Sequence, residues 1–217
     1  MSLAIFDLDN TLLAGDSDHA WGEFLCEEGV VDREEYSRAN DYFYAQYKSG
    51  GLDIFEFLEF ALKPLAQLER KTLDALHARF MTEKVAPMML PKAQELLQNH
   101  RDRGDYLLII TATNRFVTGP IAEALGVDEI IATDPEEIDG KYTGKVAGTP
   151  CFQDGKVTRL QHWLQSSGHT LEESYFYSDS HNDLPLLEQV TYPVAVNPDE
   201  ILDNLANERL WPVLDLR

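Results

Sequence analysis

Short apolar runs that end in polar residues alternate along much of the chain with segments of helical periodicity. The apolar runs predict five strands, at Leu3–Phe6, Tyr106–Ile110, Asp128–Ala132, Ser174–Tyr177 and Tyr192–Val196. Helices that stop at or near a glycine are predicted between them, at Lys92–Arg103, Phe116–Leu125 and Val157–Leu164. This alternation is typical of an α/β fold with a doubly wound parallel sheet, which places its active site beyond the carboxyl ends of the strands.

The segment from Gly15 to Pro87 interrupts this alternation, because it contains no β-like run. Its periodicity predicts consecutive helices at Trp21–Glu28, Arg33–Lys48, Asp53–Leu65 and Leu68–Thr82. Roughly 70 residues are too many for a loop inside a compact domain. We therefore predict an all-helical cap domain at residues 15–86, inserted into an α/β core formed by residues 1–14 and 87–217. Residues 137–147, with Gly140 and Gly144, indicate a β-hairpin or an extended connection.

The charge of the chain narrows its possible partners. Its 217 residues include 38 Asp and Glu but 18 Lys and Arg, for a formal net charge of −20. Such a surface repels nucleic acids and anionic membranes, so we expect neither as a partner. Cys26 and Cys151 are too few for a disulfide framework, and the first motif begins at position 7, so we expect a cytoplasmic protein without a leader peptide. No pattern indicates an oligomeric state.

Two acidic pairs follow predicted strands. In Asp7-Leu-Asp-Asn-Thr11, carboxylates two residues apart on extended backbone point to the same side, which suits a nucleophile or metal ligand and its acid/base partner. Asp179 and Asp183, with Asn182 between them, form an oxygen-rich group suited to Mg²⁺. Each pair alone is also compatible with a solvated turn. His181 lies in the second loop and is more typical of a histidine that contacts neighbours or solvent than of a magnesium ligand.

Two further residues are candidates for binding an anion. Thr111 follows an apolar run and precedes a predicted helix, where a hydroxyl and free backbone N–H groups suit an anion, although it could equally serve as a helix N-cap. Lys156 lies in Gly155-Lys-Val-Thr158, which is not a phosphate-binding P-loop, because Pro150 stands where such a loop needs glycine. Taken alone, Lys156 is more typical of an exposed surface lysine.

The order of these motifs, from an acid pair through Thr and Lys to a second acid pair, resembles that of the haloacid dehalogenase-like hydrolases. The resemblance covers nearly the whole chain, and the helical insertion resembles the C1 cap of that family, in an order most similar to its phosphoserine phosphatase-like branch. It implies a Mg²⁺-dependent phosphatase that acts on a small-molecule phosphomonoester through an aspartyl-phosphate. It also implies that Thr111 and Lys156 hold the phosphoryl oxygens.

The same resemblance assigns roles to the four motif carboxylates. Asp7 would be the nucleophile, and Asp9 would protonate the leaving alkoxide and later activate water. The carboxylates of Asp7 and Asp179 and the backbone carbonyl of Asp9 would bind Mg²⁺, with Asp183 supporting them. A phosphotransferase on the same fold is an alternative, whereas Asp9 argues against a dehalogenase. A catalytically idle binding protein would be expected to lack one of these four acids, and all are present.

The cap should select the substrate. In phosphoserine phosphatases an acid nine residues beyond the nucleophile faces the substrate ammonium, and here that position is Asp16, with Asp18 and His19 beside it. N-capping of a helix is an alternative or additional role for Asp16. Those enzymes also hold the serine carboxylate with a cap arginine, and the corresponding position here is Glu59, in a stretch (Leu52–Leu62) without a basic residue. A carboxylate would be repelled there, which disfavours phosphoserine.

An acidic cap suits a phosphomonoester with a cationic tail and no carboxylate. The chain looks similar to bacterial histidinol-phosphatases of this family, and L-histidinol phosphate is the substrate that we favour, with other amino-alcohol phosphates and phosphoserine as alternatives. Four cap aromatics could offer flat surfaces for a ring or a cation, although aromatic residues at such spacing are more typical of a core: Trp21, Tyr42, Phe43 and Tyr44.

Overall fold

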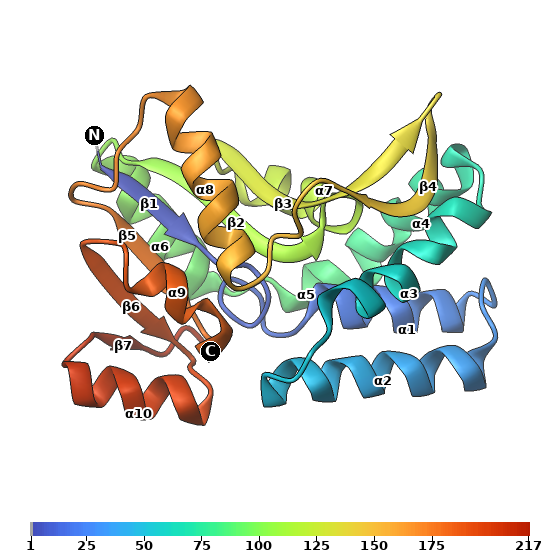
Figure 1. The fold of residues 1–217 in the computed structure, drawn as a ribbon, viewed down its shortest axis with the longest axis horizontal. Helices are drawn as coiled ribbons and strands as arrows, with labels where there is room; N and C mark the ends of the chain where they lie inside the picture. The colour runs from blue at the N-terminus through green and yellow to red at the C-terminus, as the bar shows by residue number, and fades with distance from the viewer. Residues whose placement is uncertain (1) are drawn as a thin grey trace.

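A seven-stranded sheet forms the centre of the computed structural model, which describes residues 2–217 (Figure 1). Its strand order is β4-β3-β2-β1-β5-β6-β7, and the neighbours pair in parallel except β3 and β4. This arrangement confirms the predicted doubly wound α/β fold. The strands are β1 Leu3–Phe6, β2 Tyr106–Asn114, β3 Glu129–Ile138, β4 Lys141–Ala147, β5 Tyr175–Ser178, β6 Tyr192–Val196 and β7 Val213–Leu214.

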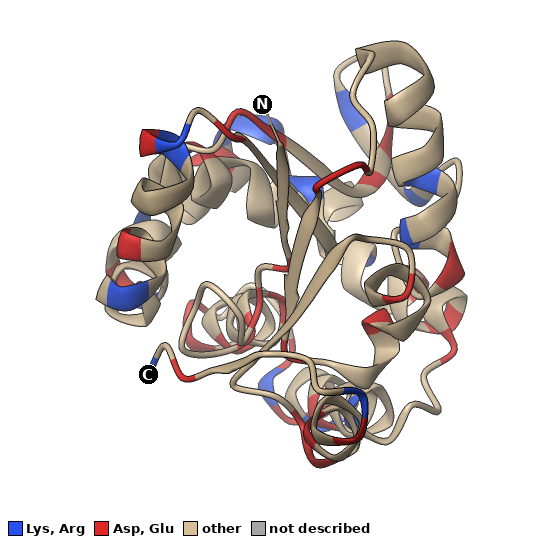
Figure 2. Ribbon diagram, turned by 90° about the vertical axis from the view of Figure 1, so that its left-hand side faces the viewer, with Lys and Arg blue, Asp and Glu red and all other residues tan. Residues whose placement is uncertain are grey.

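Helices cover both faces of the sheet, which Figure 2 shows nearly edge-on. Side chains of β1 alternate between the two faces: Ala4 and Phe6 pack into one hydrophobic cluster, and Leu3 and Ile5 into the other. The first cluster is closed by α6 (Pro91–Asp102) and α7 (Arg115–Leu125). The second is closed by α8 (Asp154–Ser167), α9 (Leu184–Leu187) and α10 (Glu200–Arg209). Burial on both faces explains why the strands are continuous apolar runs.

Residues 17–88 contain only helices among their regular elements, as predicted. Aspartates accept backbone N–H bonds at the N-termini of three of them, and Gly50 ends α2 in the left-handed region with φ of 75°. Trp21, Phe24 and Phe80 join these helices to the cluster under α6 and α7. No helix within residues 2–217 has the length and apolar character needed to cross a membrane. The helices are α1 Ser17–Glu27, α2 Arg33–Ser49, α3 Ile54–Gln67, α4 Arg70–Phe80, a π-helical turn Met81–Val85 and α5 Ala86–Met88.

The two connections between the helical region and the sheet run side by side. Leu13 and Met89 form an antiparallel bridge, and the Ala14 backbone N–H donates to the Met88 carbonyl at 2.8 Å. Helical backbone continues from α4 through α5, so the expected division after residue 86 falls within a helical segment. The domain division at 14/15 and 86/87 stays a prediction.

Several boundaries differ from those expected. The strand expected at Asp128–Ala132 and the hairpin expected at 137–147 form one unit, because β3 runs into a tight turn at Asp139 and Gly140, where φ is 51° and 77°. Gly144 brings β4 against α3, and a Cβ built there would lie 3.2 Å from that of Ala66. The sequence did not predict α10 or β7. The strand β7 has only two residues and depends on pairing with β6.

Candidate active site

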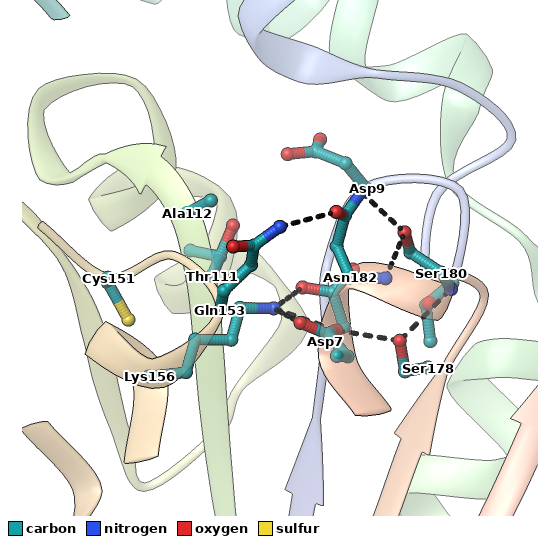
Figure 3. Close-up of polar contacts among 12 residues, drawn as sticks. Asp7, Asp9, Thr111, Ala112, Cys151, Gln153, Lys156, Ser178, Ser180 and Asn182 are labelled. Atoms are coloured by element: carbon teal, nitrogen blue, oxygen red, sulfur yellow. Dashed lines mark hydrogen bonds and ion pairs between the residues drawn. The ribbon is translucent and has the colours of Figure 1, made fainter. Parts of the chain in front are cut away.

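The predicted motif carboxylates converge at the carboxyl ends of β1 and β5, where Figure 3 shows Asp7 and Lys156 facing each other. Asp7 follows β1 directly, and its backbone N–H donates to the Tyr177 carbonyl at 2.9 Å, which extends the pairing of β1 with β5. The Asp7 side chain is buried. Asp183 follows β5 and is also buried, so two carboxylates far apart in the sequence are both buried at this edge of the sheet.

Lys156 lies between these two carboxylates. Its Nζ donates to Asp7 Oδ1 at 2.7 Å and to Asp183 Oδ2 at 2.8 Å, and the residue is only 2% exposed. The surface-lysine alternative is therefore wrong. Gly155 permits this position, because a Cβ there would lie 2.1 Å from the Pro150 carbonyl oxygen. Burial alone would lower the pKa of Lys156, but Asp183 and Asp7 raise it, so the group carries a fixed positive charge.

One lysine does not neutralise this group of acids. Burial raises the pKa of Asp7 to about 7. Lys156 lowers this pKa, but the repulsion from Asp183 offsets part of that lowering. The pKa of Asp179 is raised well above its usual range by burial and by the charges of Asp7 and Asp183. Thr11 Oγ1 donates to Asp179 Oδ1 at 3.2 Å, whereas no ion pair reaches Asp179 among residues 2–217.

This donor set fits a divalent cation. A cation would offset the repulsion that raises the pKa of Asp179, and oxygen ligands are those that Mg²⁺ prefers. The motif carboxylates are not gathered closely enough to form a complete set of metal ligands by themselves, however. Within residues 2–217, only His19, Glu23 and Asp41, between α1 and α2, bring three His, Cys, Asp or Glu ligand atoms within 4.8 Å of one another.

Neighbouring hydroxyl and amide groups orient the loop after β5. The Ser178 hydroxyl donates to Asp183 Oδ2 at 2.7 Å, and the Asp179 backbone N–H donates to Thr11 Oγ1 at 3.0 Å. Asn182 Nδ2 donates to the Tyr47 carbonyl of α2 at 3.1 Å, and its Oδ1 accepts from Gln153 at 3.0 Å (Figure 3). Asn182 thus connects the loop after β5 to α2.

Asp9 lies at the junction of the core and the cap. Its Oδ1 accepts the backbone N–H of Ser17, the first residue of α1, at 2.6 Å, and its Oδ2 accepts the Thr113 hydroxyl at 2.8 Å. Burial raises the pKa of Asp9 to about 7, with help from the nearby charge of Asp16, although the two hydrogen bonds oppose that shift. A carboxyl group with a pKa near neutrality can both give and accept a proton at physiological pH.

A bulge in β2 presents Thr111 and Thr113 to the same space. From Ile110 to Asn114, β2 advances by four residues while β3 advances by two, from Ile131 to Thr133. Both threonines are buried and line the cavity beside Asp7 and Asp9. The N-cap alternative for Thr111 is wrong, because the Asn114 side chain caps α7 by accepting the Val117 N–H.

A cavity lies between these groups and the helices α1, α2 and α3. Asp16 and Asp18 line it, and burial raises the pKa of both, most strongly for Asp18, which also faces the charges of Asp16 and Asp9. No Lys or Arg is among the residues that line the cavity within 2–217. The other lining residues are His19, Asn40, Phe43, Tyr44, Tyr47, Leu52, Ile54, Phe57, Ala112 and Phe152, with Asp7, Asp9, Thr111 and Thr113 at the core end.

The remaining cap candidates divide. Asp16 caps α1 by accepting the His19 N–H at 2.8 Å, so the capping role is confirmed while the residue also lines the cavity. Glu59 requires a correction: it is exposed and lines a separate cleft between α3 and β4, because its face of α3 turns away from the cavity. His181 donates its backbone N–H to Asp199 at 2.8 Å, as expected of a histidine that contacts its neighbours.

The cap aromatics also divide. Phe43 and Tyr44 line the cavity, whereas Trp21 is buried in the core and Tyr42 is 55% exposed. The sequence reasoning missed Thr113 as a partner of Asp9. A signal was available: Thr111 and Thr113 are two residues apart, the spacing that places side chains on one side of extended backbone.

The chain is similar in sequence and in fold to known proteins. The family model of haloacid dehalogenase-like hydrolases matches residues 4–188. A histidinol-phosphatase of Neisseria meningitidis is 47% identical over 100% of this chain and 99% of its own length. A Bordetella pertussis structure, described as a protein with unknown function, is 46% identical and covers 100% of this chain and 99% of its own, with a TM-score of 0.94. A substrate-bound phosphoserine phosphatase, 19% identical, shares the fold with a TM-score of 0.71 over 94% of this chain and 89% of its own.

Proposed function

The chain belongs to the haloacid dehalogenase-like hydrolase family and is a phosphoric monoester hydrolase, and from this premise we propose that its substrate is L-histidinol phosphate or a similar cationic amino-alcohol phosphate. One observation carries the choice of substrate. Two half-buried cavity acids, Asp16 and Asp18, face a space that no Lys or Arg of residues 2–217 lines. A substrate ammonium would supply the missing positive charge, because removing a carboxylate from water is unfavourable unless it is paired.

The core end of the site supports in-line attack on phosphorus by Asp7. A carboxylate oxygen of Asp7 forms a bond to phosphorus while the bond to the ester oxygen breaks, which leaves an aspartyl-phosphate and an alkoxide. Lys156 holds Asp7 at 2.7 Å and provides fixed positive charge for the phosphoryl oxygens, to which Thr111 can donate its hydroxyl proton. This end of the cavity would bind the phosphoryl group of any phosphomonoester and would not select among substrates.

Asp9 moves the proton in both halves of the reaction. In the first half its carboxyl group donates a proton to the departing alkoxide, which is a poor leaving group when unprotonated. In the second half the resulting carboxylate takes a proton from the water that attacks the aspartyl-phosphate, which restores Asp7 and releases phosphate. Its position at 2.6 Å from the first turn of α1 makes this group sensitive to the placement of the cap.

Mg²⁺ is the cofactor that we propose, held by the carboxylates of Asp7 and Asp179 and the backbone carbonyl of Asp9, with Asp183 as support. When bound, it would neutralise charge between the phosphate dianion and the carboxylates, which otherwise repel each other. The donors are all oxygen atoms and one lysine leaves them undercompensated, which supports this assignment.

The name of the Neisseria relative supports histidinol phosphate over phosphoserine. The cavity supports it independently, because a phosphoserine carboxylate would meet Asp16 and Asp18 with no Lys or Arg among the lining residues of 2–217. Phe43, Leu52, Ile54 and Phe57 provide an apolar wall on which an imidazole ring can pack. Phosphoserine hydrolysis and phosphoryl transfer to an added alcohol are the alternatives.

The test is phosphate release from L-histidinol phosphate and L-phosphoserine, each with Mg²⁺ and with excess EDTA, and with Asp7→Asn as the blank. We expect turnover of L-histidinol phosphate that needs Mg²⁺ and is absent from the blank. A preference for phosphoserine would show that another group binds the carboxylate. Product appearing only when an acceptor alcohol is added would favour the phosphotransferase.

A further inference from the structure

We propose that Thr113 is a positioning residue for Asp9, whose carboxylate it aims at the leaving group of the substrate. This inference rests on the proposed function, because it presupposes that Asp9 is the acid/base. Neither the acidic motifs nor the predicted roles of the family residues include Thr113. Its hydroxyl lies 2.8 Å from Asp9 Oδ2, and its side chain comes from β2, whereas the partner of Oδ1 is the first residue of α1.

The two oxygens of Asp9 have partners of different chemical character. Ser17 contacts Oδ1 with a backbone N–H, which can only donate, so Oδ1 is held as an acceptor. Thr113 contacts Oδ2 with a hydroxyl, which can rotate and can donate or accept. Oδ2 is therefore the oxygen that can exchange a proton with the substrate and remain hydrogen-bonded to the protein. Thr113 determines where that oxygen points.

The backbone around Thr113 is built to present it. The bulge between Ile110 and Asn114 turns Thr111 and Thr113 toward the cavity, and the Thr113 backbone N–H donates to Thr111 Oγ1 at 3.3 Å. Thr113 is 6% exposed, so solvent does not readily replace its hydroxyl if that group is removed. One hydroxyl of the pair thus faces the phosphoryl end and the other holds the acid/base.

Leaving groups of different acidity separate this role from a structural one. The value of kcat/KM covers steps up to departure of the leaving group, and an alkoxide needs a proton at that step whereas p-nitrophenolate does not. We would measure kcat/KM for L-histidinol phosphate and p-nitrophenyl phosphate with wild type, Thr113→Val and Thr113→Ser. The matched control is Thr118→Val, which removes another buried threonine hydroxyl, one that donates to the Asn114 carbonyl and does not line the cavity.

In Thr113→Val we expect kcat/KM to fall about 10- to 100-fold for L-histidinol phosphate and less than about 3-fold for p-nitrophenyl phosphate. Thr113→Ser should restore the alkyl-ester activity to within about 3-fold, and Thr118→Val should leave the ratio of the two activities unchanged. An equal fall on both esters, or Thr113→Ser behaving like Thr113→Val, would overturn the proposal while the proposed function stands. If wild type released phosphate from neither ester, the proposed function would fail first and this inference with it.

Discussion

The carboxylates at the two ends of the cavity have different partners. At the core end, Asp7 and Asp183 both accept a hydrogen bond from the buried Lys156 ammonium. At the cap end, Asp16 and Asp18 line a wall that carries no Lys or Arg of residues 2–217, and the hydrogen bond that reaches Asp18 is a long one of 3.5 Å from Asn114. In the described part of the chain, the core end thus contains a lysine of its own, and the cap end contains neither Lys nor Arg.

This difference separates generic chemistry from selectivity. Under the proposed function, the groups at the core end act on phosphorus and are needed for every phosphomonoester. The half-buried acids at the cap end are unfavourable for the folded protein without a positive charge beside them, because partial burial penalises a carboxylate. Under the proposed function, the ammonium group of the substrate would supply at the cap end the charge that Lys156 supplies at the core end.

Removing Lys156 should make the core end resemble the cap end, and it has the largest expected effect on stability. In Lys156→Met, Asp7 and Asp183 lose their common partner, and we expect the free energy of unfolding to fall by about 3–5 kcal/mol in EDTA. Activity should fall to that of the blank. Urea unfolding followed by circular dichroism measures the change.

The matched control is Lys145→Met, which removes an exposed lysine that has no ion pair among residues 2–217. Its stability should stay within about 0.5 kcal/mol of wild type. Equal stabilities of the two variants would show that Lys156 does not compensate the buried acids.

A smaller effect should appear at the cap end when the pH is changed. The pKa of Asp18 is raised in the folded protein, so its contribution to stability is present at low pH, below the unfolded pKa, and is lost as the pH rises. Asp18→Asn removes this loss. In EDTA we expect the variant to match wild type near pH 3, below the unfolded pKa of the carboxyl, and to exceed it near pH 8 by about 1 kcal/mol, or roughly 2–4 °C in Tm.

Glu59→Gln removes a negative charge from the exposed face of the same region and serves as the control. Its Tm should follow wild type at both pH values. A rise in Tm of equal size in both variants would indicate relief of the overall charge of −20 rather than of the buried site.

The sequence predicted the fold and the core end better than the cap end, for a physical reason. Strand ends are marked locally, because an apolar run followed by Asp7 or Asp179 shows where a buried strand emerges. Lys156 has no such local marker. Its burial depends on a turn at Gly155 and on two carboxylates that are distant in the sequence. Only the order of the motifs predicted its role.

The cap end depends on which face of each helix turns inward. Asp18 and Glu59 both lie on cap helices, yet Asp18 lines the cavity and Glu59 lines another cleft. A shift of one residue turns a helix position by about 100°, so an ungapped comparison of sequences does not decide such a case. The bulge in β2 near Thr113 is a property of the pairing with β3, although the two-residue spacing of Thr111 and Thr113 was visible in the sequence.

The most direct test of the account is whether Asp18 favours a substrate that carries an ammonium group. The measurement is kcat/KM of wild type, Asp18→Asn and Glu59→Gln for L-histidinol phosphate and for its deamino analogue, which keeps the imidazole ring but lacks the ammonium group. For Asp18→Asn we predict a fall of about 10- to 100-fold on L-histidinol phosphate, or about 1.4–2.8 kcal/mol, and less than about 3-fold on the analogue, with Glu59→Gln unchanged on both. Equal losses on the two esters, or no loss on either, would contradict the assignment of the cap acids to a cationic substrate.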